Sequence, residues 1–100
     1  MIFEDLKFNP LTIKENGVEG IHANVRFGRY EISVIRHTMS YGNKKGLYEI
    51  GVFLDGTDMI ELPGITDEGN TIKGHLCEEG VTNIFKKMYM MTGEMGESVV

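Results

Sequence analysis

Three histidines and one cysteine are the side chains best suited to metal binding or nucleophilic catalysis. His22, His37 and His75 form no HxH or HxxxH pattern, and Cys77 belongs to no CxxC motif. A zinc site needs three or four converging ligands and further hydrogen bonds that orient them. We therefore interpret His22 and His37 as solvent-facing strand residues and His75 as a loop residue, and we expect no bound metal.

Cys77 precedes Glu78 and Glu79 at the expected start of a helix, a position that can make a thiol reactive. The two acids oppose a thiolate, and the sequence places no base beside it. We interpret Cys77 as a half-buried capping residue. Because no nucleophile–base pair can be named, we expect the protein not to be an enzyme and to use no cofactor.

Acidic residues gather in the second half of the chain, where paired carboxylates could perform acid–base chemistry or bind a divalent cation. The segment 55–58 (DGTD) lacks the length and the terminal glutamate of an EF-hand loop. We interpret the cluster as turn-forming acids. Its members are Asp55, Asp58, Glu61, Asp67 and Glu68.

The segment 40–46 (SYGNKKG) has the composition of a binding loop. Lys44 and Lys45 could meet a phosphate or an acidic group, with Tyr41 and Asn43 beside them. The residue order is not that of a Walker phosphate-binding loop, and an ordinary flexible connection is the alternative. If one short segment carries the function, we expect this one, because loops held by a rigid scaffold commonly do.

Methionine is abundant, with seven in one hundred residues, and four of the seven lie in or just after the expected C-terminal helix. Met88 and Met91 fit the buried stripe of that helix, whereas Met90 does not and Tyr89 is borderline. Flexible methionines are common on adaptable binding surfaces. Tyr89 and Met90 are therefore candidates for a partner or dimer surface, and core packing followed by a frayed tail is the alternative.

The elements that must position these residues indicate an α+β domain, an antiparallel sheet of about four strands packed by one helix. The clearest element is a hairpin over residues 21–36, in which apolar and polar residues alternate around a Gly28-Arg29 turn of type II′. On the polar face, His22 and Arg26 are further candidate interaction residues, and Arg26 should face Glu31. The register pairs Phe27 with Tyr30, Val25 with Ile32, and Ala23 with Val34.

A second hairpin is expected over residues 47–62, around the Asp55-Gly56 turn. Its apolar pattern favours a loop with an odd number of residues, which aligns Ile60 and Leu62 with Val52 and Ile50. Residues 65–76 are interpreted as a loop, with one helical turn as an alternative. Residues 2–8 are a short strand or an irregular arm.

The one convincing helix is expected over residues 78–92, and Gly93 supplies its C-terminal stop. Residues 94–100 are expected to fray, and residues 1–100 form a single domain. Apolar residues at helical spacing give the helix one buried stripe, made of Val81, Ile84, Phe85, Met88 and Met91.

Charge and composition narrow the possible partners and the compartment. A formal net charge of −5 does not favour a nucleic-acid partner, which needs a basic face. No apolar stretch is long enough to span a bilayer, so no membrane partner is expected. A single cysteine fits a reducing compartment, and the acidic start is unlike a signal peptide. We therefore expect a cytoplasmic protein.

Several short segments, spread over most of the chain, together resemble a group of small proteins encoded by tailed bacteriophages and prophages. They are residues 3–10 (FEDLKFNP), 40–42 (SYG), 46–49 (GLYE), 55–56 (DG), 65–67 (ITD), 74–76 (GHL) and 78–81 (EEGV), with extra residues around 68–71. The group has no established activity, so the resemblance implies no site residue. It implies a phage product in the host cell cytoplasm, where such proteins often bind and block a host protein.

From these observations we expect an accessory protein that binds a host protein, for example as an inhibitor of host defence. The alternatives are a virion or assembly component, and a small-ligand protein that binds a nucleotide with Lys44, Lys45 and Tyr41. A homodimer through a sheet edge or the helix edge also stays open.

Overall fold

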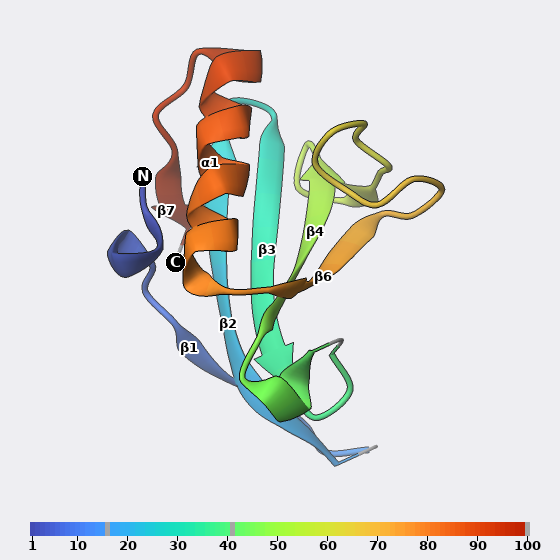
Figure 1. Ribbon diagram of the computed structural model, residues 1–100. Coiled ribbons are helices and arrows are strands. Elements are labelled where there is room, and N and C mark those ends of the chain that lie inside the picture. The colour runs from blue at the N-terminus through green and yellow to red at the C-terminus, as the bar shows by residue number, and fades with distance from the viewer. Residues whose placement is uncertain (16, 41, 100) are drawn as a thin grey trace.

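The computed structural model describes residues 1–15, 17–40 and 42–99 and shows an α+β domain with one α-helix against an antiparallel sheet (Figure 1). The described residues form seven strands, more than the four expected. Two short 3-10 helices, η1 (Phe3–Asp5) and η2 (Asn43–Lys45), complete the fold. The other elements are β1 (Asn9–Ile13), β2 (Val18–Phe27), β3 (Tyr30–His37), β4 (Tyr48–Leu54), β5 (Asp58–Met59), β6 (Ile72–Leu76), α1 (Glu78–Thr92) and β7 (Glu97–Val99).

The β2–β3 hairpin has the register predicted from its alternating pattern. Phe27 pairs with Tyr30 across the turn, and Arg26 faces Glu31. Gly28 has a φ of 62° whereas Arg29 keeps a negative φ, as a type II′ turn requires. The turn chemistry and the apolar pattern therefore specify the same pairing.

The loop after β4 has the predicted odd length, because Leu54 pairs with Asp58 and leaves three residues between them. The N–H of Ile60 donates to the carbonyl oxygen of Val52 over 3.0 Å, as expected for that pair. The expected pairing of Leu62 with Ile50 is wrong, because Ile50 pairs with Lys73 of β6. The expected second strand is shorter than predicted, since β5 contains only two residues. Pro63 cannot donate to a ladder, and the backbone of Leu62 bonds instead to the Thr66 hydroxyl.

Two short strands, placed end to end, line each outer edge of the β2–β3–β4 meander. β1 pairs with residues 18–22 of β2, and β7 pairs with residues 24–26. Along β4, β6 pairs with residues 48–51 and β5 with residues 53–54. These pairings explain the three additional strands.

Two sequence predictions are corrected at these edges. Residues 72–76 form β6 rather than a loop, and residues 97–99 of the tail expected to fray form β7. β7 reaches β2 because Gly96, at a φ of 86°, lies so close to Phe27 that a Cβ would stand 2.9 Å from its ring. Such pairing depends on residues far apart in sequence, which local alternation does not reveal.

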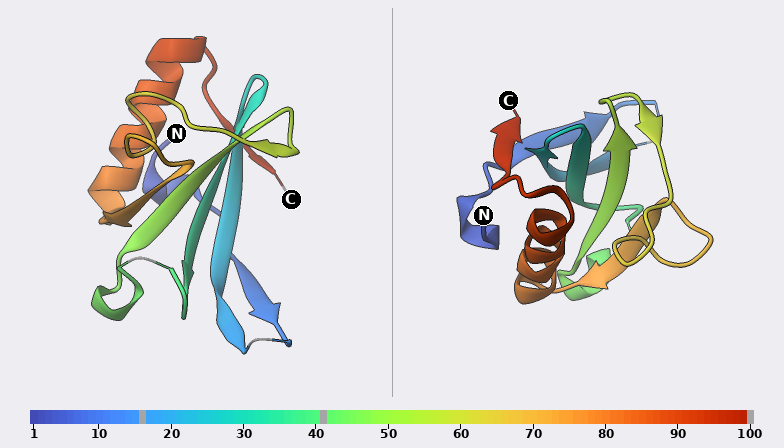
Figure 2. Two further views of the ribbon diagram at one scale, coloured as in Figure 1. Left: turned by 90° about the vertical axis from the view of Figure 1, so that its right-hand side faces the viewer. Right: turned by 90° about the horizontal axis from the view of Figure 1, so that it is seen from above.

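Helix α1 covers one face of the sheet, so that helix and sheet form two layers (Figure 2). The predicted stripe is buried at four of its positions, and the rings of Phe27 and Phe85 lie 5.8 Å apart. Met91 differs from the prediction and is 51% exposed, because the last turn of α1 extends beyond the ends of β2 and β3. The buried members of the stripe are Val81, Ile84, Phe85 and Met88.

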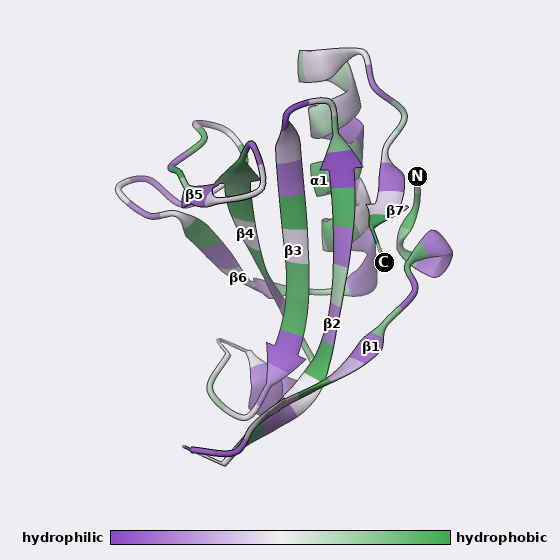
Figure 3. Cartoon of the chain, turned by 180° about the vertical axis from the view of Figure 1, so that it is seen from behind, coloured by the Kyte–Doolittle hydropathy of each residue, from purple (hydrophilic) through white to green (hydrophobic). Residues whose placement is uncertain are grey.

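The ends of α1 are capped as its sequence suggests. The Cys77 sulfur accepts a hydrogen bond of 3.4 Å from the N–H of Gly80, although Cys77 is exposed rather than half-buried. Gly93 ends the helix with a φ of 73°, and its N–H donates to the carbonyl oxygen of Tyr89. No α-helix or strand of the described residues covers the opposite face of the sheet, which Figure 3 shows from behind.

Candidate functional site

The residues proposed from the sequence fall on separate parts of the surface. Those of the 40–46 loop and those of the helix edge each border a cavity, and the two polar hairpin residues lie on the sheet. Tyr41 is outside the described residues. The structure therefore brings together the described candidates of the loop and those of the helix edge, but it does not join the separate segments into one site.

On the polar hairpin face, Glu31 contacts both Asn24 and Arg26 of the neighbouring strand. The Glu31 carboxylate, whose side chain is 14% exposed, accepts a 2.8 Å hydrogen bond from Asn24 Nδ2 and lies 3.8 Å from Arg26 Nη2. His22 borders a different cavity from Arg26. This arrangement stabilises the sheet face, and it does not gather His22 and Arg26 at a common ligand site.

A nearby ion pair holds the ends of two hairpins together. Arg29 Nη2 lies 3.0 Å from Asp55 Oδ2, and the N–H of Asp55 donates to the carbonyl oxygen of Arg29. The hydrogen bond and attraction to Asp55 raise the pKa of the Arg29 guanidinium. We call this exposed pair the Arg29–Asp55 clasp.

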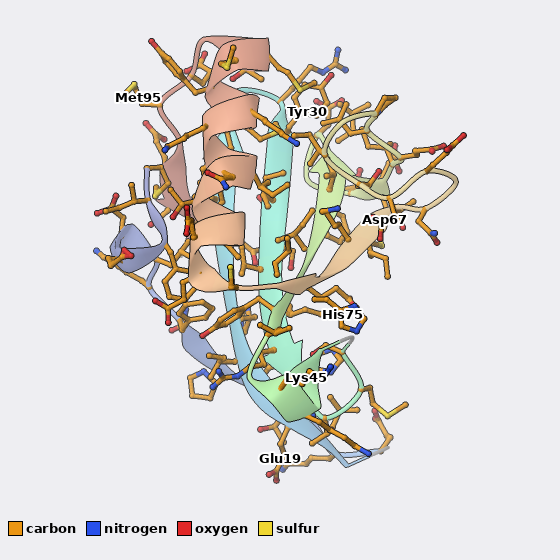
Figure 4. All side chains as sticks on the ribbon, in the orientation of Figure 1. Glu19, Tyr30, Lys45, Asp67, His75 and Met95 are labelled. Carbon is orange, nitrogen blue, oxygen red and sulfur yellow. The ribbon has the colours of Figure 1, made fainter. Side chains whose placement is uncertain are left out.

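The 40–46 loop borders a cavity of about 420 Å³, which we call the loop cavity. Its basic side chains, Lys44 and Lys45, come from η2 and are both exposed. Figure 4 shows Lys45 and His75 at the same end of the molecule. The lining residues are Thr38, Met39, Ser40, Gly42, Asn43, Lys44, Lys45 and His75.

Local hydrogen bonds and one close backbone contact hold this loop in place. The buried hydroxyl of Ser40 accepts from the N–H of His37 and donates to its carbonyl oxygen, both over 2.9 Å. A Cβ at Gly42 would lie 2.8 Å from the Cβ of Leu47 and 3.1 Å from the Cα of His75. The absence of a side chain at Gly42 therefore lets the loop rest on β6.

His75 is a cavity residue that the sequence interpretation missed, because it assigned residues 65–76 to a loop. In the structure His75 belongs to β6 and has a φ of 58°, a left-handed conformation that is uncommon for a residue other than glycine. Met39 also joins the cavity, and its side chain is 74% exposed. Only the tertiary contact at Gly42 could have revealed that His75 belongs to this site.

The helix edge borders an open cavity of about 520 Å³. Four exposed apolar side chains surround it, and we call them the methionine-rich surface: Ile2, Tyr89, Met90 and Met95. Met1, Phe85 and Lys86 complete the lining. Figure 4 shows Met95 beside α1, on the side where the N-terminal segment lies.

Three segments build the methionine-rich surface. Helical spacing places Tyr89 and Met90 one turn after Phe85 and Lys86, on the same strip of α1. The left-handed turn at Gly93 reverses the chain and returns Met95 to the helix. The sequence predicted Tyr89 and Met90, whereas the roles of Ile2 and Met95 depend on this chain reversal and on the docking of η1.

The chemical character of the two cavities differs. The methionine-rich surface offers apolar contact with one lysine at its border, and the loop cavity offers cations, a hydroxyl and an amide.

Within the described ranges, no three His, Cys, Asp or Glu side chains gather as a metal site would require. In the same part of the chain, no helix is long and apolar enough to cross a membrane.

Comparison with known protein families, with curated proteins and with solved structures finds no match to this chain.

Proposed function

We propose that the protein is a non-enzymatic accessory protein that acts by binding a partner protein through the methionine-rich surface. The observation that carries this proposal is the clustering of exposed apolar side chains. Among the described residues, seven large hydrophobic side chains are exposed, and four of them surround this one cavity. Single exposed apolar residues are ordinary, but a contiguous group is typical of an interaction site.

The chemistry of the surface favours a partner that inserts apolar side chains. Met90 is 84% exposed, and methionine can change rotamer to fit ligands of different shape at little energetic cost. Tyr89 offers a rigid ring of the kind found at the energetic centre of interfaces. Lys86 at the border would pair with an acidic residue next to the inserted side chains.

We propose the class of partner from the resemblance of the short segments to phage proteins. On that basis the partner is a host protein met in the host cytoplasm, and inhibition of host defence is the more specific form of the proposal. A second copy of this chain is the rival occupant, because an apolar surface can also be self-complementary.

The test is affinity capture from bacterial lysate with three proteins: the wild type, Met90→Glu and Met39→Glu. Both substitutions place a carboxylate at an exposed methionine, and only Met90 belongs to the methionine-rich surface. We expect one stoichiometric host protein with the wild type and with Met39→Glu, and its loss with Met90→Glu. Equal capture by all three proteins would contradict the proposal.

Light scattering of the purified chain distinguishes binding of a host protein from binding of a second copy of this chain. A monomer that binds the captured protein one to one supports the proposal. A wild-type dimer that Met90→Glu converts to a monomer, with no host protein captured, would assign the surface to self-association instead.

A further inference from the structure

We propose that the loop cavity binds a small phosphorylated ligand of mononucleotide size. This function is separate from partner binding, because the cavity shares no residue with the methionine-rich surface. Its volume of about 420 Å³ lies within the range of roughly 300–1,000 Å³ that is common for small-molecule sites.

The charge of the cavity is opposite to that of the chain as a whole. The formal net charge of the protein is −5, yet the described residues that line the cavity include Lys44 and Lys45 and no acidic residue. Adjacent lysines at one border would attract an anion and hold it by charge-assisted hydrogen bonds. A phosphate group suits this arrangement, because it offers several acceptor oxygens to separate donors.

The remaining lining supplies further contacts for such a ligand. The Thr38 hydroxyl and the Asn43 amide can donate to phosphate or ribose oxygens, and His75 lines the same cavity. Met39 is exposed and apolar, so it can lie against the face of a base. The cavity therefore combines an anionic subsite with an apolar wall.

The backbone around the cavity is held before any ligand arrives. Ser40 and Gly42 anchor the loop through the contacts described above, and the Nδ1 atom of His37 accepts a 3.0 Å hydrogen bond from the N–H of Met39. His75 keeps its left-handed conformation within a strand. A site held in this way loses less conformational entropy on binding than a flexible loop would.

Calorimetric titration tests the proposal with AMP, inorganic phosphate and adenosine as probes. We expect AMP to bind, phosphate to bind more weakly and to compete with AMP, and adenosine to show no measurable binding. If adenosine binds as well as AMP, or if neither AMP nor phosphate binds at millimolar concentration, the proposal is wrong.

The variant Lys44→Gln/Lys45→Gln should weaken AMP binding by about tenfold or more, because it removes both cations. The control Lys7→Gln/Lys87→Gln removes the same charge from two exposed lysines that line neither the loop cavity nor the methionine-rich surface. An equal loss in both variants would indicate non-specific attraction and overturn the proposal.

Met39→Glu gives a second test without removing a lysine, since a carboxylate on the apolar wall should repel phosphate and weaken AMP binding.

Discussion

The N–H of Phe3 donates a hydrogen bond of 2.8 Å to the hydroxyl oxygen of Thr82. This contact attaches the N-terminal segment to α1, and the Phe3 ring extends the attachment by packing edge-on against Tyr48 at 5.0 Å. Ile2 is thereby held beside the helix strip that carries Tyr89 and Met90. The methionine-rich surface thus depends on residues that are nearly eighty positions apart.

Thr82→Val should loosen this attachment, because valine has nearly the shape of threonine and cannot accept the hydrogen bond. We expect the free energy of unfolding to fall by about 1 kcal/mol, the usual loss for such a bond. Hydrogen exchange at the Phe3 amide should become faster. Thr57→Val, at an exposed turn position, is the control, and equal exchange at Phe3 in both variants would show that the contact does not hold the segment.

Gly96→Ala should destabilise the protein by about 2 kcal/mol or more and release β7, because the new Cβ combines left-handed strain with a clash against Phe27. Urea unfolding and hydrogen exchange in β2 measure the two effects. Gly64→Ala is a matched control, since Gly64 has a φ of 85° but open space around it. If the two variants lose equal stability, close packing of Gly96 on Phe27 is not what holds β7.

Gly42→Ala should displace the 40–46 loop from β6, because its Cβ would meet Leu47 and the backbone of His75. We expect AMP affinity to fall by about tenfold while the captured partner binds as before. Gly69→Ala, at a similar positive φ with no neighbour within 4 Å, should leave AMP binding unchanged. Unaltered AMP affinity in Gly42→Ala would argue against a preformed loop cavity.

The Arg29–Asp55 clasp should contribute equally to the free energy of unfolding at neutral and at mildly alkaline pH. The pKa of Arg29 is raised by Asp55, so the stabilisation is complete below the ordinary pKa of arginine. It is lost only as the pH rises through the higher value of the folded state. The difference in unfolding free energy between the wild type and Arg29→Gln should therefore match at about pH 7 and about pH 9. A difference that shrinks between these pH values would contradict the assignment.

The β2–β3 hairpin could be predicted from sequence because a short loop, Gly28-Arg29, and local alternation specify the same register. The short strands β1, β6 and β7 could not be predicted in the same way. These strands are stabilised by pairing with the outer edges of β2 and β4, and their own apolar patterns are weak. Gly96 indicates the position of β7 only once it is known to pack against Phe27, which is far away in the sequence.

The same distinction applies to the candidate sites. Tyr89 and Met90 could be proposed because helical spacing shows which residues lie off the buried stripe. Ile2 and Met95 reach them only through η1 docking and the turn at Gly93. Likewise, Lys44 and Lys45 were recognisable from composition, whereas His75 joins them through a tertiary contact.

The most direct test of the central claim is the dissociation constant of the captured partner, measured by calorimetry for Met90→Glu and Met39→Glu. Both variants should unfold at nearly the wild-type temperature, because both methionines are largely exposed. We predict that Met90→Glu raises the dissociation constant by about tenfold or more and that Met39→Glu leaves it unchanged. An unchanged constant in Met90→Glu, or an equal rise in both variants, would contradict the claim that the methionine-rich surface binds the partner.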